Sequence, residues 1–168
     1  MSFDYNMTRV NRILNHLDYK ECLVRLQERE RERKFCCHNI SHFLDVARIA
    51  YIINLEMKLN INIELIYSVA LLHDIGKSVK DVKNIGHSKL SVQLAKPILY
   101  DCGFVDWEVE CILDAILNHN NEKIKDFAED TLASLLYRAD KLSRPCYMCD
   151  VRNLCYWSLE NKNLQLKI

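Results

Sequence analysis

The sequence predicts an all-α protein. Apolar side chains recur at spacings of three, four and seven residues along most of the chain, which is the repeat of an amphipathic helix. Only three glycines and two prolines interrupt the 168 residues, and the turn patterns of β-rich proteins are absent. With 49% apolar residues at this length, we expect one compact domain over residues 1–168 with a sizeable core.

Charge and hydropathy indicate which partners to expect. The 23 basic and 23 acidic residues balance, so bulk electrostatics does not favour nucleic acid. No apolar run approaches the roughly 18 residues of a membrane-spanning helix, and the N-terminus lacks the apolar core of a signal peptide. We therefore expect no membrane association and a cytoplasmic location.

Two helical segments open the chain. Residues 6–34 carry an apolar stripe that begins at Val10, and we interpret them as one or two helices. Within them the strongly charged stretch 27–34 is typical of a solvated helix face. Residues 39–58 are predicted to form the next helix, and its apolar stripe begins at His42.

After a short turn, residues 63–74 are predicted to form a central helix that ends in a His-Asp pair. His73 lies on the apolar stripe of this helix, and an ionisable group on a core face needs a partner. Because neighbouring helical residues point about 100° apart, His73 and Asp74 can approach one metal only at a helix end. Gly76 favours that end as a C-cap, and Lys77 places a positive charge where a phosphate could bind.

Three further helices are expected after polar loops, over residues 87–100, 106–119 and 130–142. Each carries an ionisable residue that burial would leave in need of a partner. His87 opens the first, and His119 ends the second as His73 ends the central helix. Asp140 continues the apolar stripe of the third helix, and Pro145 prevents that helix from continuing smoothly.

Together these residues are difficult to bury without metal: His42, His73, Asp74, His87, His119 and Asp140. In order and spacing they resemble the HD-domain superfamily of metal-dependent phosphohydrolases. The sequences around His42, around His73-Asp74 and around Asp140 are similar to that family's first-histidine helix, its signature and its last-aspartate helix. The resemblance covers residues 36–144 and implies a helical bundle of the HD-domain type, with 145–168 as a cysteine-containing extension.

The resemblance also implies a ligand set. One divalent metal would be held by His42, His73, Asp74 and Asp140. His87 and His119 resemble the additional ligands of the family's binuclear branch, in which Asp74 bridges two metals. A mixed histidine and carboxylate site suits iron, manganese or a similar metal.

The implied activity is hydrolysis of a small phosphorylated substrate, a nucleotide or another phosphate ester or anhydride. Metals bring the pKa of bound water toward about 7, so we expect attack of metal-bound hydroxide on phosphorus, with Asp74 and Lys77 as catalytic residues. Lys77 and, as a weaker candidate, Arg144 would contact the phosphate. Two alternatives stay open: a non-catalytic nucleotide- or metal-sensing module, and an iron–sulfur or zinc protein dominated by its cysteines. The sequence does not decide whether the chain forms a homo-oligomer.

Five cysteines lie near the two ends of the motif region: Cys36 and Cys37 at its start, and Cys146, Cys149 and Cys155 just after it. In a reducing compartment these are thiols or metal ligands rather than disulfides. If the helices of His42 and Asp140 run antiparallel, the two cysteine groups leave on the same side and could meet. Four thiolates suit structural zinc or an iron–sulfur cluster, whereas the alternative is small apolar packing residues. His38 could join either metal site or only the core, and three cysteines are assigned to packing: Cys22, Cys102 and Cys111.

Overall fold

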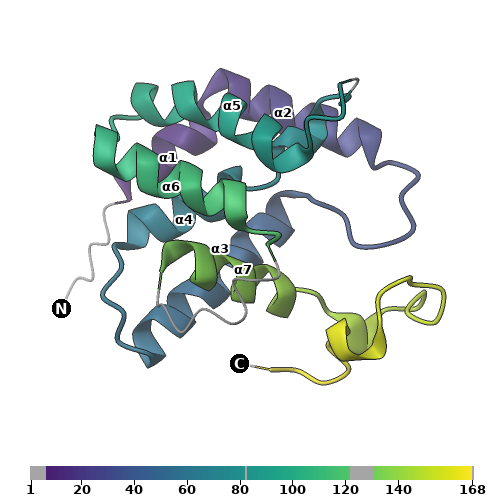
Figure 1. Ribbon diagram of the computed structural model, residues 1–168. Coiled ribbons are helices and arrows are strands. Elements are labelled where there is room, and N and C mark those ends of the chain that lie inside the picture. The colour runs from purple at the N-terminus through teal and green to yellow at the C-terminus, as the bar shows by residue number, and fades with distance from the viewer. Residues whose placement is uncertain (1–6, 82, 122–130, 168) are drawn as a thin grey trace.

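The computed structural model describes residues 7–81, 83–121 and 131–167. Within them the chain forms seven α-helices and no strand, which confirms the all-α prediction (Figure 1). The α-helices are α1 (Thr8–Asn15), α2 (Leu17–Arg29), α3 (Ile40–Glu56), α4 (Ile63–Leu72), α5 (His87–Asp101), α6 (Asp106–Asn118) and α7 (Leu132–Leu142). Three short 3-10 helices accompany them: η1 (Ile75–Ser78), η3 (Cys146–Met148) and η4 (Leu159–Asn161).

Helix α4 is the centre of the fold. Every residue from Leu65 to Leu72 except Tyr67 is buried, as expected for a helix that is apolar on all sides. It packs against α1, α3, α6 and α7. In Figure 1 it lies between α2 and α5 on one side and α3 and α7 on the other. The residues that follow α4 are therefore placed deep in the molecule.

The end of α4 differs in one respect from the prediction. The helix ends at Leu72, His73 is its C-cap residue, and Asp74 leads into η1. Gly76 lies inside η1 rather than in a left-handed C-cap, so its predicted role is wrong. A Cβ there would lie 2.2 Å from the backbone oxygen of His87 and 2.5 Å from the backbone nitrogen of Ser91. Glycine is needed because η1 and the first turn of α5 approach so closely.

The other boundaries agree with the predicted ones within a few residues. The segment 6–34 breaks into two helices at His16, whose extended backbone and side chain cap α2. Most of the predicted loop 120–129 and the first residue of the predicted last helix lie outside the described residues.

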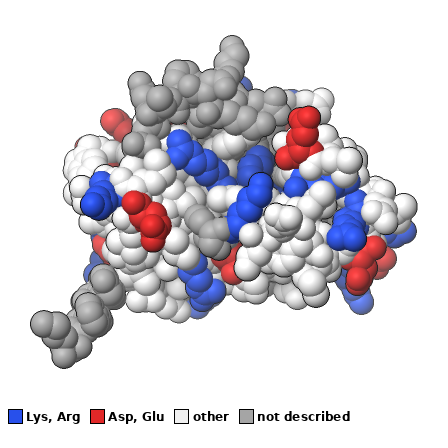
Figure 2. All heavy atoms as spheres, turned by 90° about the horizontal axis from the view of Figure 1, so that it is seen from below, with Lys and Arg blue, Asp and Glu red and all other residues white. Residues whose placement is uncertain are grey.

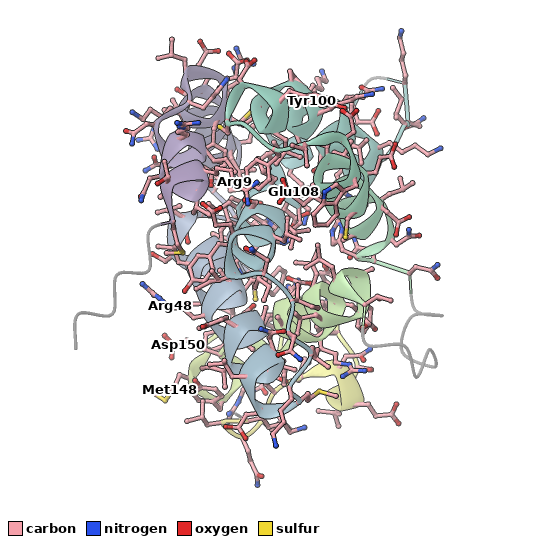
Figure 3. All side chains as sticks on the ribbon, turned by 90° about the vertical axis from the view of Figure 1, so that its left-hand side faces the viewer. Arg9, Arg48, Tyr100, Glu108, Met148 and Asp150 are labelled. Atoms are coloured by element: carbon pink, nitrogen blue, oxygen red, sulfur yellow. The ribbon has the colours of Figure 1, made fainter. Side chains whose placement is uncertain are left out.

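Arg9 joins α1 to the centre of the fold. Its Nε lies 2.6 Å from Glu64 Oε2, and its Nη1 lies 2.5 Å from Glu108 Oε2. The guanidinium also stacks on Phe104, 4.2 Å from the ring centroid. Figure 3 shows Arg9 and Glu108 near one another. This partly buried cluster ties α1 to α4 and α6.

The C-terminal extension, residues 145–167 as described, folds back along α7 (Figure 1). Its main polar anchor is the Asn163 amide, which donates to the backbone oxygens of Lys141, Leu142 and Arg144 at 2.7, 3.3 and 2.9 Å. The Lys141 and Leu142 carbonyls lie in the last turn of α7 and have no partner within the helix, so Asn163 acts as a cap from a distant position.

Charge is unevenly distributed although the net charge is zero. Figure 2 shows Lys and Arg side chains gathered across the middle of the face seen from below, with Asp and Glu mostly nearer its edges. Among the described helices, none is long and apolar enough to cross a bilayer.

Candidate metal centre

Six ionisable side chains meet where the ends of α4, α6 and α7 approach the starts of α3 and α5. They form two groups, which we call the first triad (His42, His73 and Asp140) and the second triad (Asp74, His87 and His119). Within each triad, one potential ligand atom from every residue lies within 4.8 Å of the others. These are the six residues singled out in the sequence.

Most of this cluster is withdrawn from water. His73, Asp74, His119 and Asp140 are all buried, and His87 is the most accessible of the six, with its side chain 37% exposed. Buried polar atoms are normally hydrogen-bonded. Here His42 Nε2, His73 Nε2 and Asp74 Oδ1 are buried without a hydrogen-bond partner. A bound cation would satisfy all three, so the residues fit a metal site.

Two of the histidines are held in the same way. His73 Nδ1 lies 2.7 Å from the Ala70 carbonyl oxygen, and His119 Nδ1 lies 2.6 Å from that of Ile116. Because a carbonyl can only accept, Nδ1 carries the proton in each ring, and Nε2 presents its lone pair to the centre. The histidines that follow α4 and α6 are therefore oriented by the same hydrogen bond, from Nδ1 to a carbonyl oxygen of the preceding helical turn.

The Asp74 carboxylate lies between the triads. Its Oδ1 is 3.5 Å from both His87 Nε2 and His119 Nε2, within the second triad. Its Oδ2 is 3.4 Å from His73 Nε2, which belongs to the first triad. One carboxylate with an oxygen toward each triad has the arrangement needed to bridge two cations.

The protonation states suit metal binding. Burial lowers the pKa of His73 to about 3, so its imidazole is neutral at physiological pH. Burial alone would raise the pKa of Asp74, but His73, His119 and Lys77 outweigh it and hold that pKa well below its ordinary value. The pKa of Asp140 is likewise low because His42 and Arg144 outweigh its burial. Neutral imidazoles and ionised carboxylates are the ligand forms that first-row divalent metals take.

A second set of side chains supports this centre. The sequence singled out two of its members, Lys77 and His38, but not the third, Glu30. Lys77 Nζ lies 2.5 Å from Asp74 Oδ2 and 2.8 Å from Nε2 of the buried His38. His38 Nδ1 in turn lies 2.6 Å from Glu30 Oε1. The prediction that residues 27–34 form a solvated face is wrong for Glu30, because its carboxylate binds the buried His38. The sequence does not distinguish Glu30 from its charged neighbours. We call Glu30, His38 and Lys77 the lysine relay.

Three other residues touch the triads. The Asn120 amide lies 2.7 Å from His87 Nε2 and 2.8 Å from His119 Nε2. Ser143 Oγ lies 3.3 Å from Nδ1 of His42. Arg144 Nη2 lies 3.4 Å from both carboxylate oxygens of Asp140. Arg144 is therefore a partner of the first triad, whereas Asn120 and Ser143 come from polar segments without a distinguishing sequence signal.

The two cysteine groups do approach each other. The five flanking cysteines line one cavity of about 530 Å³, which His42 and Arg144 also line. Among the described residues, no three thiols lie within 4.8 Å of one another. The eight cysteines are all free thiols. Of the three assigned to packing, Cys22 and Cys102 are buried and Cys111 is partly buried.

Comparison with known proteins gives a family and a relative. The family model described as HD domain matches residues 39–144. A protein of Clostridium beijerinckii, described as an uncharacterized protein, is 45% identical over 160 residues, which cover 95% of this chain and 99% of that protein. No solved structure gives a significant match. The cysteines of the C-terminal extension lie outside the family match.

Proposed function

The chain belongs to the HD-domain family, and on that premise we propose that it is a metal-dependent phosphohydrolase acting on a nucleotide or another small phosphorylated compound. The observation that carries the proposal is the pair of triads with the Asp74 carboxylate between them. Divalent metals bound there would polarise phosphoryl oxygens and provide a nucleophilic water at neutral pH.

The protein residues would have distinct tasks. His42, His73 and Asp140 would hold one metal, and His87 and His119 would hold the second. Asp74, whose two carboxylate oxygens face different triads, would help to hold both. Four of these six side chains are buried, which limits rearrangement when substrate binds.

Lys77 is the best-placed cation for the substrate. Its side chain is 25% exposed, so the ammonium lies beside Asp74 and within reach of solvent. His38 accepts from the ammonium on one side, which fixes its direction. A phosphate oxygen bound at Asp74's metals would lie close to this charge, which would stabilise negative charge in the transition state.

The first experiment is a metal and activity assay on protein purified without chelator. We expect about two equivalents of iron, manganese or a similar metal per chain and turnover of at least one member of a panel of nucleotides and phosphodiesters. Asp74→Asn should lose both metals and hydrolysis, while His87→Ala should lose one metal. His16→Ala is the matched control, because His16 caps α2 and lies outside both triads.

Three outcomes would contradict the proposal. Full hydrolysis by folded Asp74→Asn would show that the Asp74 carboxylate is not needed for the reaction. Nucleotide binding without turnover in metal-loaded protein would favour the sensing module instead. Absence of bound metal even after reconstitution would mean that the triads are not a metal centre.

A further inference from the structure

The C-terminal extension has almost no apolar core of its own. Among its described residues, Cys146 alone is buried. Six of its large apolar side chains are 48–77% exposed: Met148, Leu154, Tyr156, Leu159, Leu164 and Leu166. Trp157 is partly buried and stacks under Lys141 and Arg144. Segments that bury so little apolar surface usually depend on a disulfide or a metal for a fixed structure. The cysteines here form no disulfide, and a metal held by them would give the extension a fixed structure.

Four thiols surround a common space at the base of this extension. Cys36, Cys146 and Cys155 line a small hollow beside Arg144 and Trp157. The same three cysteines, with Cys149, also line the cavity of about 530 Å³. Cys36 comes from the loop before α3, so the cysteines join segments that are distant in the sequence.

Cys37 is different from these four. It is exposed, and its thiol donates to the Phe35 backbone oxygen at 3.5 Å. It lines the large cavity but not the small hollow. The structure therefore distinguishes two neighbouring cysteines that the sequence could not.

We propose that Cys36, Cys146, Cys149 and Cys155 bind a four-iron, four-sulfide cluster that fastens the extension to the loop before α3. The spacing of the thiols favours a cluster over a single ion. Zinc draws four sulfurs to about 2.3 Å from one point, which places them close together. Here no three thiols of the described chain lie within 4.8 Å, although they enclose one space. A cluster puts iron and sulfide between its four cysteines and so spans a wider enclosure.

The surroundings suit an anionic cluster. The cavity is lined by four basic residues, Lys34, Arg144, Arg152 and Lys162, against two acidic ones, Asp45 and Asp150. Arg144 contacts the Cys36 thiol directly, so a guanidinium lies beside the proposed cluster.

Arg144 also connects the cluster to the metal centre, since the same guanidinium lies 3.4 Å from Asp140. Loss of the cluster should therefore alter the first triad as well. This consequence rests on the proposed function, whereas the cluster itself does not. Acid-labile sulfide distinguishes the two, because the His and Asp centre contains none.

The test is anaerobic purification followed by visible spectroscopy and measurement of iron and acid-labile sulfide. We expect about four sulfides per chain and the broad visible absorbance of a cluster. Cys149→Ala and Cys155→Ala should each lose the sulfide, whereas the matched control Cys37→Ala should keep it. His73→Ala should keep the sulfide while losing metal at the triads, so each proposal can fail alone.

Absence of sulfide from wild-type protein, after anaerobic reconstitution with ferrous iron and sulfide, would overturn the proposal. Zinc at the cysteines without sulfide would overturn it too. Loss of the cluster in Cys37→Ala together with its retention in Cys155→Ala would overturn the ligand assignment. The wild-type measurements decide the matter even if a cysteine variant fails to fold.

Discussion

Gly76→Ala tests how the second triad is positioned. The added Cβ would lie 2.2 Å from the His87 backbone oxygen and 2.5 Å from the Ser91 backbone nitrogen. Both are backbone atoms, so no side-chain rotation can relieve the contact. The substitution therefore pushes η1 away from the start of α5, the helix that carries His87.

The size of the effect follows from these distances. Ordinary contact begins at 3.4 Å, so the two segments must separate by about 1 Å in a closely packed interior. Overpacking of this kind costs about 1–3 kcal/mol. The hydrogen bond from Gly76 N to Ser91 Oγ, now 2.8 Å, would also weaken, at a further cost of about 1 kcal/mol. We expect a loss of about 3 kcal/mol in the free energy of unfolding.

Urea unfolding of metal-free protein, followed by circular dichroism, measures this loss without any contribution from bound metal. The matched control is Gly86→Ala, next to His87. Its Cβ would meet nothing within 4 Å, but its φ of +92° should cost about 1 kcal/mol in backbone strain. Metal analysis should show Gly76→Ala keeping the first metal and losing the second. If the unfolding free energy changed by less than about 0.5 kcal/mol, the close approach of η1 and α5 would be refuted.

Three other substitutions test separate parts of the structure. Arg9→Met should lower the free energy of unfolding by about 2–3 kcal/mol in urea, because two partly buried carboxylates lose their partner; unchanged stability would contradict this. Glu30→Gln should keep its metals but lower kcat about 10-fold, measured by steady-state kinetics on the best substrate of the panel, because the lysine relay loses its anchor. An unchanged kcat would show that the contact of Glu30 with the lysine relay does not affect turnover. Asn163→Ala should cost about 1–2 kcal/mol in urea unfolding, as the end of α7 loses its cap, and a neutral effect would mean that water replaces the amide.

Much of the fold and of the candidate centre was accessible from the sequence, for a local reason. Helical periodicity shows which face of each helix is buried, and His73 and Asp140 interrupt such faces. An ionisable side chain in that position must find a partner, so each interruption points toward a common centre. That inference needs no knowledge of how the helices pack.

The supporting residues were not accessible, because their roles depend on packing between distant segments. Glu30 lies in a stretch of alternating charge, yet it is the one whose carboxylate binds the buried His38. Gly76 has its function only because α5 returns against η1. Periodicity separates buried from exposed faces, but it does not show which distant backbone or side chain will be met there.

The position of the centre at the end of α4 links stability to the site. Helix α4 is buried over most of its length, and His73 and Asp74 continue directly from it. The apolar packing of α4 holds His73 Nε2 and Asp74 Oδ1 in place although neither has a hydrogen-bond partner. A buried polar atom without a partner lowers the free energy of unfolding, so these two atoms destabilise the folded chain when no metal is bound. Metal binding to the triads would remove that cost, so the core that positions the ligands would also be the part of the fold that metal stabilises most.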